Sequence, residues 1–80
     1  MLTLSFKQQT MLQFIRDFIA GKGYPPTYEE IRVGLNLSTK SLVDYHLTKL
    51  EAAGRIQRDP KTPRGLRIVQ SFPNSLVGNP

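Results

Sequence analysis

The sequence predicts a mainly α-helical domain that ends in a small β-hairpin, and three observations indicate this fold class. Apolar residues recur at helical spacing in three segments, each preceded by a Ser or Thr that can cap a helix. Two short segments with alternating polar and apolar residues then flank a turn-rich loop. The chain has 80 residues, of which 39% are hydrophobic, and this suits one small folded domain.

The first helix is predicted over about residues 6–20. Ser5 and Gln8 have the spacing of a capping box, in which each side chain accepts a hydrogen bond from the other residue's backbone N–H. Gly21 and Gly23 are expected to end the helix. Its wide apolar face is expected to form core, and it consists of Met11, Phe14, Ile15, Phe18 and Ile19.

The second helix is predicted to be short, over about residues 28–34. It cannot begin earlier, because the second proline of Pro25-Pro26 forces the first into an extended conformation. Thr27 and Glu30 form a second capping box directly after the prolines. The side chains expected to be buried here are Ile31 and Leu35.

The third helix is predicted to run to about Ala53, after a turn over residues 34–37. Ser38 and Thr39 can each cap its start. One apolar stripe is expected to face the core, and it contains Val43, Leu47 and Leu50. The opposite face carries hydrogen-bonding side chains, namely Ser41, Tyr45, Thr48 and Lys49. Gly54 is expected to adopt the left-handed conformation that ends many helices.

A β-hairpin is predicted directly after the third helix. Residues 55–58 and 66–69 alternate polar and apolar side chains, and residues 59–65 form the loop between them. Three helices followed by a two-stranded wing is the order of a winged helix-turn-helix domain. We therefore expect this domain to occupy residues 1–70, with residues 71–80 as a linker or the start of a further domain.

The charge of the chain favours an anionic partner. The net charge is +5, and residues 38–70 hold seven Lys or Arg against three Asp or Glu, a net +4. Nucleic acid, a membrane surface and an acidic protein are all compatible with this charge. There is no cysteine, no apolar run long enough to span a bilayer and no signal-peptide pattern at the N-terminus. A cytoplasmic, nucleoid-associated protein without a membrane partner is the expectation.

The polar face of the third helix suits DNA recognition. Ser41 can bond several base edges, and Tyr45 can offer a hydroxyl or its ring. The alternative is a solvated helix face without a partner. Leu42 flanks the core stripe, so it is expected either to pack against the second helix or to contact a thymine methyl group.

Six further side chains are candidates for contacts with the DNA backbone. Lys7, Tyr28 and Thr39 lie near helix starts, where backbone N–H groups and the helix dipole favour phosphate. Lys61 and Arg64 lie in the hairpin loop and could reach flanking phosphates or the minor groove, and Lys49 is on the polar face of the third helix. The alternative role for each cation is solubility.

The sequence offers no catalytic residues, and we expect neither a cofactor nor a metal. His46 has no second His, no Cys and no paired carboxylate at ligand spacing. It is expected to be a partly buried, hydrogen-bonded residue at the edge of the core. Glu29 and Glu30 are adjacent on a helix and point in different directions, and the capping box already uses Glu30. An enzymatic function is therefore not expected.

Several short motifs resemble the N-terminal DNA-binding domain of LexA-type repressors. They occur in the family's order and spacing from about Leu4 to Val69, and comprise Lys7-Gln8-Gln9, Pro25-Pro26-Thr27 with Glu30-Ile31, His46-Leu47 with Leu50, Gly54 with Ile56, and Arg64-Gly65-Leu66-Arg67. Leu76-Val77-Gly78 is similar to the start of the family's second domain, a Ser–Lys self-cleaving protease that is not in this sequence. The resemblance places Thr39 at the cap of the recognition helix. It implies that bases are read from four positions, Ser41, Leu42, Asp44 and Tyr45.

Two functions are compatible with these observations. The first is a sequence-specific double-stranded DNA-binding domain of a bacterial repressor, for which the resemblance implies a role in the SOS response to DNA damage. The second is a winged-helix module that binds protein, such as a small repressor partner or antagonist. The resemblance also implies that the full-length protein is a homodimer on an inverted-repeat operator, whereas the isolated domain is expected to be monomeric.

Overall fold

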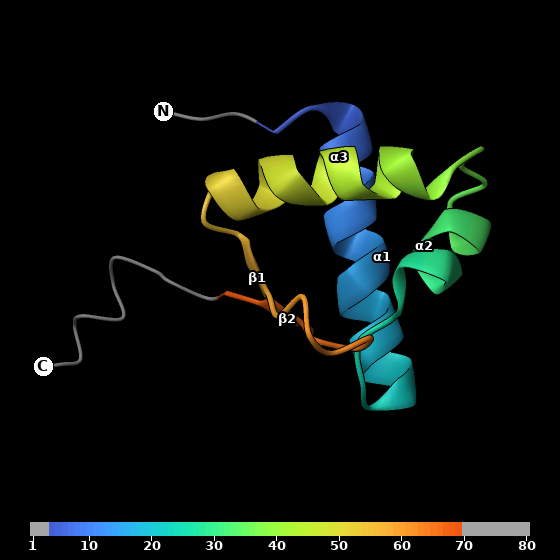
Figure 1. Cartoon of the computed structure of the whole chain (residues 1–80), viewed down its shortest axis with the longest axis vertical. Coiled ribbons are helices and arrows are strands. Elements are labelled where there is room, and N and C mark those ends of the chain that lie inside the picture. Colours follow the sequence, from blue (N-terminus) through green and yellow to red (C-terminus); the bar gives the residue numbers. More distant parts are fainter. Residues whose placement is uncertain (1–3, 70–80) are drawn as a thin grey trace, which may run out of the picture.

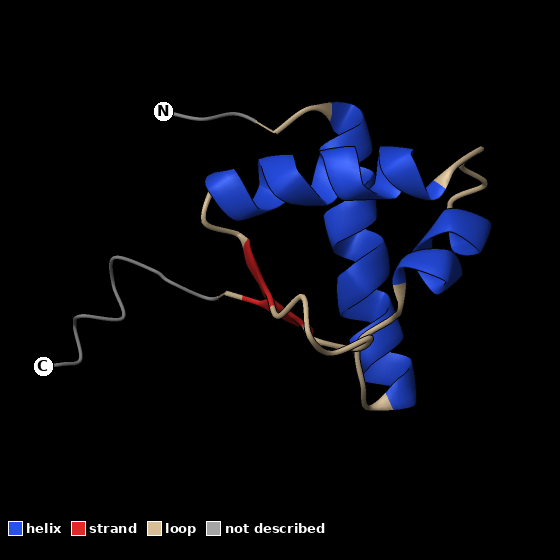
Figure 2. Cartoon of the chain, viewed as in Figure 1, coloured by secondary structure: helices blue, strands red, loops and turns tan. Residues whose placement is uncertain are grey.

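The computed structural model describes residues 4–69, which form three helices followed by a two-stranded antiparallel sheet (Figure 1, Figure 2). This arrangement confirms the predicted fold class. The elements are α1 (Phe6–Lys22), α2 (Tyr28–Gly34), α3 (Lys40–Ala52), β1 (Ile56–Arg58) and β2 (Leu66–Ile68). Residues 71–80, which are predicted to be a linker or the start of a further domain, lie outside the described residues.

The predicted caps are confirmed at all three helix starts. In α1 the Gln8 N–H donates to Ser5 Oγ at 3.1 Å and Gln8 Oε1 accepts from the Ser5 N–H, also at 3.1 Å. The Thr27–Glu30 pair forms the same reciprocal box at the start of α2. Thr39, not Ser38, caps α3, because its Oγ1 accepts from the Leu42 N–H at 3.2 Å. Each cap satisfies a backbone donor that has no partner inside its helix.

Glycines lie just beyond the ends of α1 and α3, as predicted, but the predicted last residue of α1 needs a correction. The prediction that α1 ends at residue 20 is wrong, because the helix continues through Gly21 to Lys22 and ends before Gly23, whose φ is +84°. Gly54 has the expected left-handed conformation, with φ +76°. Its N–H donates to Glu51 O, and the next N–H, of Arg55, donates to Leu50 O. These two bonds satisfy carbonyls at the end of α3 and start the chain toward the wing.

In the turn between α2 and α3, the residue with the left-handed backbone conformation is not the glycine. The residue with positive φ is Asn36, at +56°, a conformation that Asn tolerates better than most residues. Gly34 instead allows α1 and α2 to approach closely. A Cβ atom built on Gly34 would lie 2.5 Å from two ring carbons of Phe14.

The core lies where α3 crosses α1. In Figure 1, α2 lies near the start of α3 and the hairpin lies near its end. The apolar stripe of α3 is fully buried, as predicted. Leu12 and Leu66 also belong to the core, in addition to the residues predicted to lie there. Phe18 and Val69 are half-buried rather than central. The core residues are Met11, Leu12, Ile15, Ile31, Val43, Leu47, Leu50, Ile56 and Leu66.

Several large apolar or aromatic side chains of the described residues remain on the surface, among them Phe6 and Val33. Phe6 is 82% exposed and Val33 is 62% exposed, so the apolar residues of the described segment do not all face inward. Within residues 4–69, none of the helices combines the length and the apolar character needed to cross a membrane.

Candidate nucleic-acid interface

The α3 helix presents three faces, and each has a different environment. One face packs into the core through Val43, Leu47 and Leu50. A second face turns toward the wing and carries Asp44, Thr48 and Glu51, which all bind one arginine of β1. The third face is open. The prediction that Thr48 lies on the open polar face is therefore wrong, because its hydroxyl accepts a hydrogen bond from the wing.

The open face carries most of the predicted base-reading residues. Ser41 is exposed, Leu42 is 39% exposed and Tyr45 is 53% exposed. Leu42 therefore does not pack fully against α2, and its side chain can reach an external methyl group. The Lys49 ammonium lies 5.4 Å from the centre of the Tyr45 ring, close enough for a cation–π contact that restrains both side chains.

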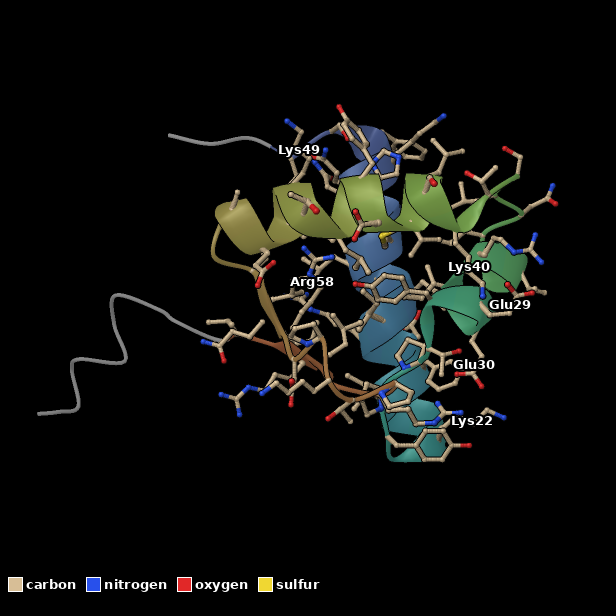
Figure 3. All side chains as sticks on the ribbon, viewed as in Figure 1. Lys22, Glu29, Glu30, Lys40, Lys49 and Arg58 are labelled. Carbon is tan, nitrogen blue, oxygen red and sulfur yellow. The ribbon has the colours of Figure 1, made fainter. Side chains whose placement is uncertain are left out.

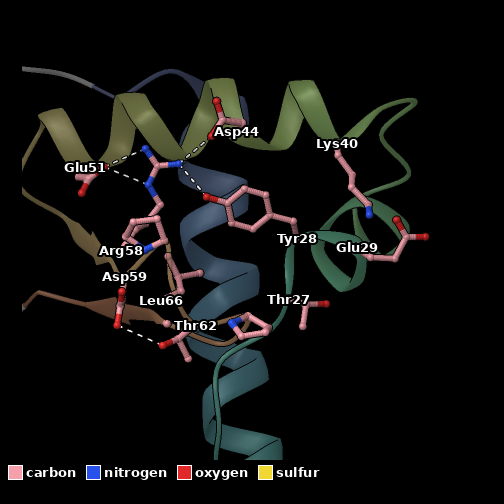
Figure 4. Close-up of a pocket in the computed structure, with 13 residues that line it drawn as sticks. Thr27, Tyr28, Glu29, Lys40, Asp44, Glu51, Arg58, Asp59, Thr62 and Leu66 are labelled. Atoms are coloured by element: carbon pink, nitrogen blue, oxygen red, sulfur yellow. Dashed lines mark hydrogen bonds and ion pairs between the residues drawn. The ribbon is translucent and has the colours of Figure 1, made fainter.

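Arg58, at the end of β1, connects the wing to α2 and α3 (Figure 4). Its Nε and Nη2 lie 3.0 and 2.8 Å from Glu51 Oε1, and Nη2 also donates to Thr48 Oγ1 at 3.1 Å. Its Nη1 donates to Asp44 Oδ1 at 3.0 Å and to Tyr28 Oη at 2.9 Å. Tyr28 and Asp44, both predicted to contact DNA, thus share Arg58 as a hydrogen-bond partner, which the sequence alone does not indicate.

The surroundings keep Arg58 charged. Burial alone would lower the pKa of its guanidinium, but the hydrogen bonds that it donates to Glu51 and Tyr28, together with the charge of its partners, outweigh burial and raise the pKa above its ordinary value. The group lines a groove of 550 Å³ between α2, α3 and the hairpin loop. Four acids line this groove, Glu29, Asp44, Glu51 and Asp59, and they outnumber its two cations, Lys40 and Arg58.

Arg64 anchors the far end of the wing to α2. Its Nη1 and Nη2 donate to the two carboxylate oxygens of Glu30 at 2.8 and 2.9 Å, and Nη1 also donates to Pro25 O at 2.8 Å. Its guanidinium carbon lies 4.5 Å from the centre of the Tyr24 ring. A two-pronged Arg–carboxylate contact is geometrically specific. Arg64 therefore has a structural role that the sequence did not reveal, and its contact with DNA remains a prediction.

The Glu30–Arg64 contact predicts acid-sensitive stability. Hydrogen bonding to Arg64, and next the Thr27 N–H, lower the pKa of Glu30 from 4.5 to about 2. A carboxyl whose pKa is lower in the folded state stabilises the fold above its unfolded pKa, and this stabilisation disappears as the pH falls. We expect the free energy of unfolding to decrease between pH 4.5 and 2 and the Glu30→Gln variant to show a flatter profile, both measured by urea denaturation at several pH values. Parallel profiles would show that Glu30 does not carry this effect.

The hairpin loop is held in one conformation by its own hydrogen bonds. Asp59 Oδ1 accepts from the Lys61 N–H at 3.0 Å and Oδ2 accepts from Thr62 Oγ1 at 3.1 Å. The Asp59 N–H donates to Gly65 O at 2.7 Å. A Cβ atom on Gly65 would lie 2.7 Å from the Asp59 carbonyl oxygen, so this position requires glycine. The loop thus presents the exposed side chain of Lys61 from an ordered turn.

The remaining predicted backbone contacts lie on exposed surface around α3. Thr39 caps its start and Lys49 lies near its end, and both residues are exposed. Figure 3 labels Lys49 together with Lys40, a further exposed cation in the first turn of α3. Lys7 is exposed in the first turn of α1 and is close enough to His46 to lower the pKa of that histidine. Exposed cations therefore lie along α3 itself and, near His46, at the start of α1.

His46 differs from the expectation in one respect. It is buried, at 9% exposure, but its Nδ1 has no hydrogen-bond partner within residues 4–69, so the expected hydrogen bond at this atom is absent. Burial, and secondarily Lys7, lower its pKa, which favours the neutral form. Within the same residues, no group of three or more His, Cys, Asp or Glu side chains could hold a metal ion.

The comparison with protein families agrees with this geometry. The model described as LexA DNA binding domain matches residues 1–65. The chain belongs to the LexA DNA-binding domain family. It is thus a DNA-binding domain of a repressor family.

Several LexA repressors are similar to this chain over most of its length. The protein of Carboxydothermus hydrogenoformans is 40% identical over 78 residues, which cover 96% of this chain and 38% of the relative. The protein of Geobacillus thermodenitrificans is 44% identical over 71 residues, covering 89% and 34%. That of Caldicellulosiruptor saccharolyticus is 47% identical over 66 residues, covering 82% and 33%. The chain thus spans between a third and two fifths of the length of these relatives.

Proposed function

We propose that this LexA-family domain recognises a specific duplex sequence by placing α3 in the major groove. The observation that carries the proposal is the open face of α3, where Ser41, Leu42 and Tyr45 are exposed while the opposite face is locked into the core. Asp44 lies beside them with an exposed side chain. A rigid helix with exposed donors, acceptors and one apolar group can match the distinct base-edge pattern of the major groove.

Phosphate contacts would set the position of the helix on the duplex. Thr39 caps α3, where the first backbone N–H groups and the helix dipole favour an anion. Lys49 extends from the same helix, Lys7 from the first turn of α1 and Lys61 from the wing loop. Tyr28 and Arg64 are candidates of a second kind, because each already makes an intramolecular contact that a phosphate would have to share.

The proposal for the whole protein is supported by its similarity to the relatives. We infer a homodimeric repressor that binds an inverted-repeat operator, acts in the SOS response and resides in the bacterial cytoplasm with the nucleoid. The relatives named here are all LexA repressors. The comparisons give no support to the alternative of a winged-helix module that binds protein.

The test separates base reading from phosphate binding. If the domain neutralises about four phosphates, the logarithm of the binding constant should fall against the logarithm of salt concentration with a slope of about −3.6. Tyr45→Ala should weaken binding to a selected sequence by about 1–3 kcal/mol and leave random duplexes almost unaffected. Lys61→Ala should weaken binding to both and reduce the slope by about 0.9. Fluorescence-anisotropy titrations at several salt concentrations measure all three effects.

Two outcomes would contradict the proposal. Absence of duplex binding at low salt would exclude the DNA contacts altogether. Equal loss on selected and random duplexes in Tyr45→Ala would instead show that the open face of α3 does not read bases.

A further inference from the structure

The carboxylate of Asp44 is hydrogen-bonded through only one of its two oxygens in the described part of the chain. Its side chain is 60% exposed, and its Oδ1 accepts a hydrogen bond from Arg58 Nη1 at 3.0 Å. Within residues 4–69, Oδ2 accepts no hydrogen bond. The carboxylate is therefore fixed at one oxygen and open at the other, on the same helix as the base-reading face.

The partner of Asp44 is itself held firmly. The Arg58 side chain is 18% exposed, and its other hydrogen bonds go to Glu51 and Thr48 of α3 and to Tyr28 of α2. These contacts come from two elements and fix both ends of the guanidinium. An aspartate bound to such a rigid group loses the rotational freedom that it would have on an open helix surface, so less entropy is lost when it forms a further contact.

Arg58 also changes what Asp44 and Glu51 present to DNA. Two carboxylates near a polyanion weaken binding unless their charge is compensated. Arg58 lies within 3.0 Å of both carboxylates and has no other acid within ion-pair distance in the described part of the chain. One cation thus reduces the repulsion from two acids while it leaves an acceptor oxygen of Asp44 available.

We propose that Arg58 is a positioning residue for base recognition, which orients Asp44 so that its open oxygen accepts a hydrogen bond from the amino group of a cytosine. Carboxylates accept from cytosine N4 in the major groove. The inference rests on the proposed function, because it requires α3 to lie in that groove. Arg58 itself need not touch DNA, and its effect on base preference is exerted through Asp44.

The experiment measures base preference position by position. The sequence bound by the unaltered domain is first selected from random duplexes, and each position is then varied in competition titrations. Both Arg58→Met and Asp44→Asn should reduce the preference for one particular base pair by about fivefold or more, at the same position of the half-site. The double variant should lose no more preference at that position than either single variant, because both changes remove one interaction. Arg58→Lys should retain only part of the preference shown by the unaltered domain, since lysine keeps the charge of arginine but not its planar fork of donors.

The matched control is Arg67→Met. Arg67 is also a wing arginine, but its guanidinium binds Gln57 within the hairpin, with Nε and Nη2 at 3.0 and 2.7 Å from Oε1. It should change overall affinity through its charge without altering preference at the Asp44 position. Thermal unfolding of each variant accompanies the titrations, and if Arg58→Met does not fold, Arg58→Lys paired with Asp44→Asn provides the same comparison.

The outcomes distinguish this inference from the proposed function. If the unaltered domain selects no sequence, both the proposed function and the inference are overturned. If it selects a sequence but Arg58→Met and Arg58→Lys keep the preference at every position, the inference alone is overturned. A uniform loss of affinity on all duplexes would likewise contradict it, because a purely structural link between β1 and α3 predicts that result.

Discussion

Replacing Leu47 with alanine is expected to destabilise the domain by about 2–5 kcal/mol. Leu47 is fully buried in the middle of α3 and belongs to the cluster that α1, α2 and β1 share. Removing its isobutyl group forfeits burial energy and leaves a cavity at the crossing of α1 and α3. The total stability of a small domain is about 5–15 kcal/mol, so one substitution removes a large fraction. Urea denaturation monitored by circular dichroism measures the loss.

Leu42→Ala is the matched control for this prediction. It removes the same atoms from the same helix, but Leu42 is 39% exposed and does not belong to the core cluster. We expect a change in stability within about 0.5 kcal/mol. If the two leucine variants are equally stable, the division of α3 into a buried and an open face is wrong, and the proposed reading face loses its basis.

The helices and their starts could be predicted because their signals are local. The Ser5–Gln8 and Thr27–Glu30 boxes join residues three apart, and the structure shows both. Gly54 likewise acts on carbonyls within the preceding turn. Gly21 has a helix-breaking tendency, yet α1 continues through it for one more residue.

The contacts that hold the wing could not be predicted, because they join distant parts of the chain. Arg58 binds Tyr28 across 30 residues, and Arg64 binds Glu30 across 34. Nothing in their residue types distinguishes these arginines from cations that face solvent or phosphate. Gly34 is a further example, because a side chain at this position would collide with Phe14 on another helix. Sequence therefore indicated that the wing is basic but not which cations are already paired.

The exposure of the candidate site's residues could be predicted from the sequence, but the contacts that they make could not. Exposure of Ser41 and Tyr45 follows from the period of the buried stripe, which the sequence shows directly. Asp44 lies about 100° from the centre of that stripe, and only the folded wing shows which charge it meets. Its pairing with Arg58 changes a free acid into a restrained acceptor. The same contact places Thr48 on the face of α3 that turns toward the wing, not on the open face.

Joining two copies of the domain is expected to raise the affinity for an inverted repeat by about 10²–10⁴. The nine core residues are used within one copy, which favours a monomer that binds a half-site weakly. In a dimer, the second α3 enters its half-site from a tethered position. Geometry requires half-sites about one helical turn apart, so that both recognition helices reach the same side of the duplex. A dimerising coiled coil fused after Pro80 supplies the tether.

The comparison requires fused and unfused chains on two duplexes, one with the palindrome and one with a single half-site. The fusion should gain strongly on the palindrome and little on the half-site, because tethering adds no contact to a single site. Inserting five base pairs between the half-sites should remove most of the gain, since it rotates one half-site to the opposite side of the duplex. Equal affinity of both chains for the palindrome would contradict the prediction. A stable dimer of the unfused chain in sedimentation without DNA would show that the domain already carries its own interface.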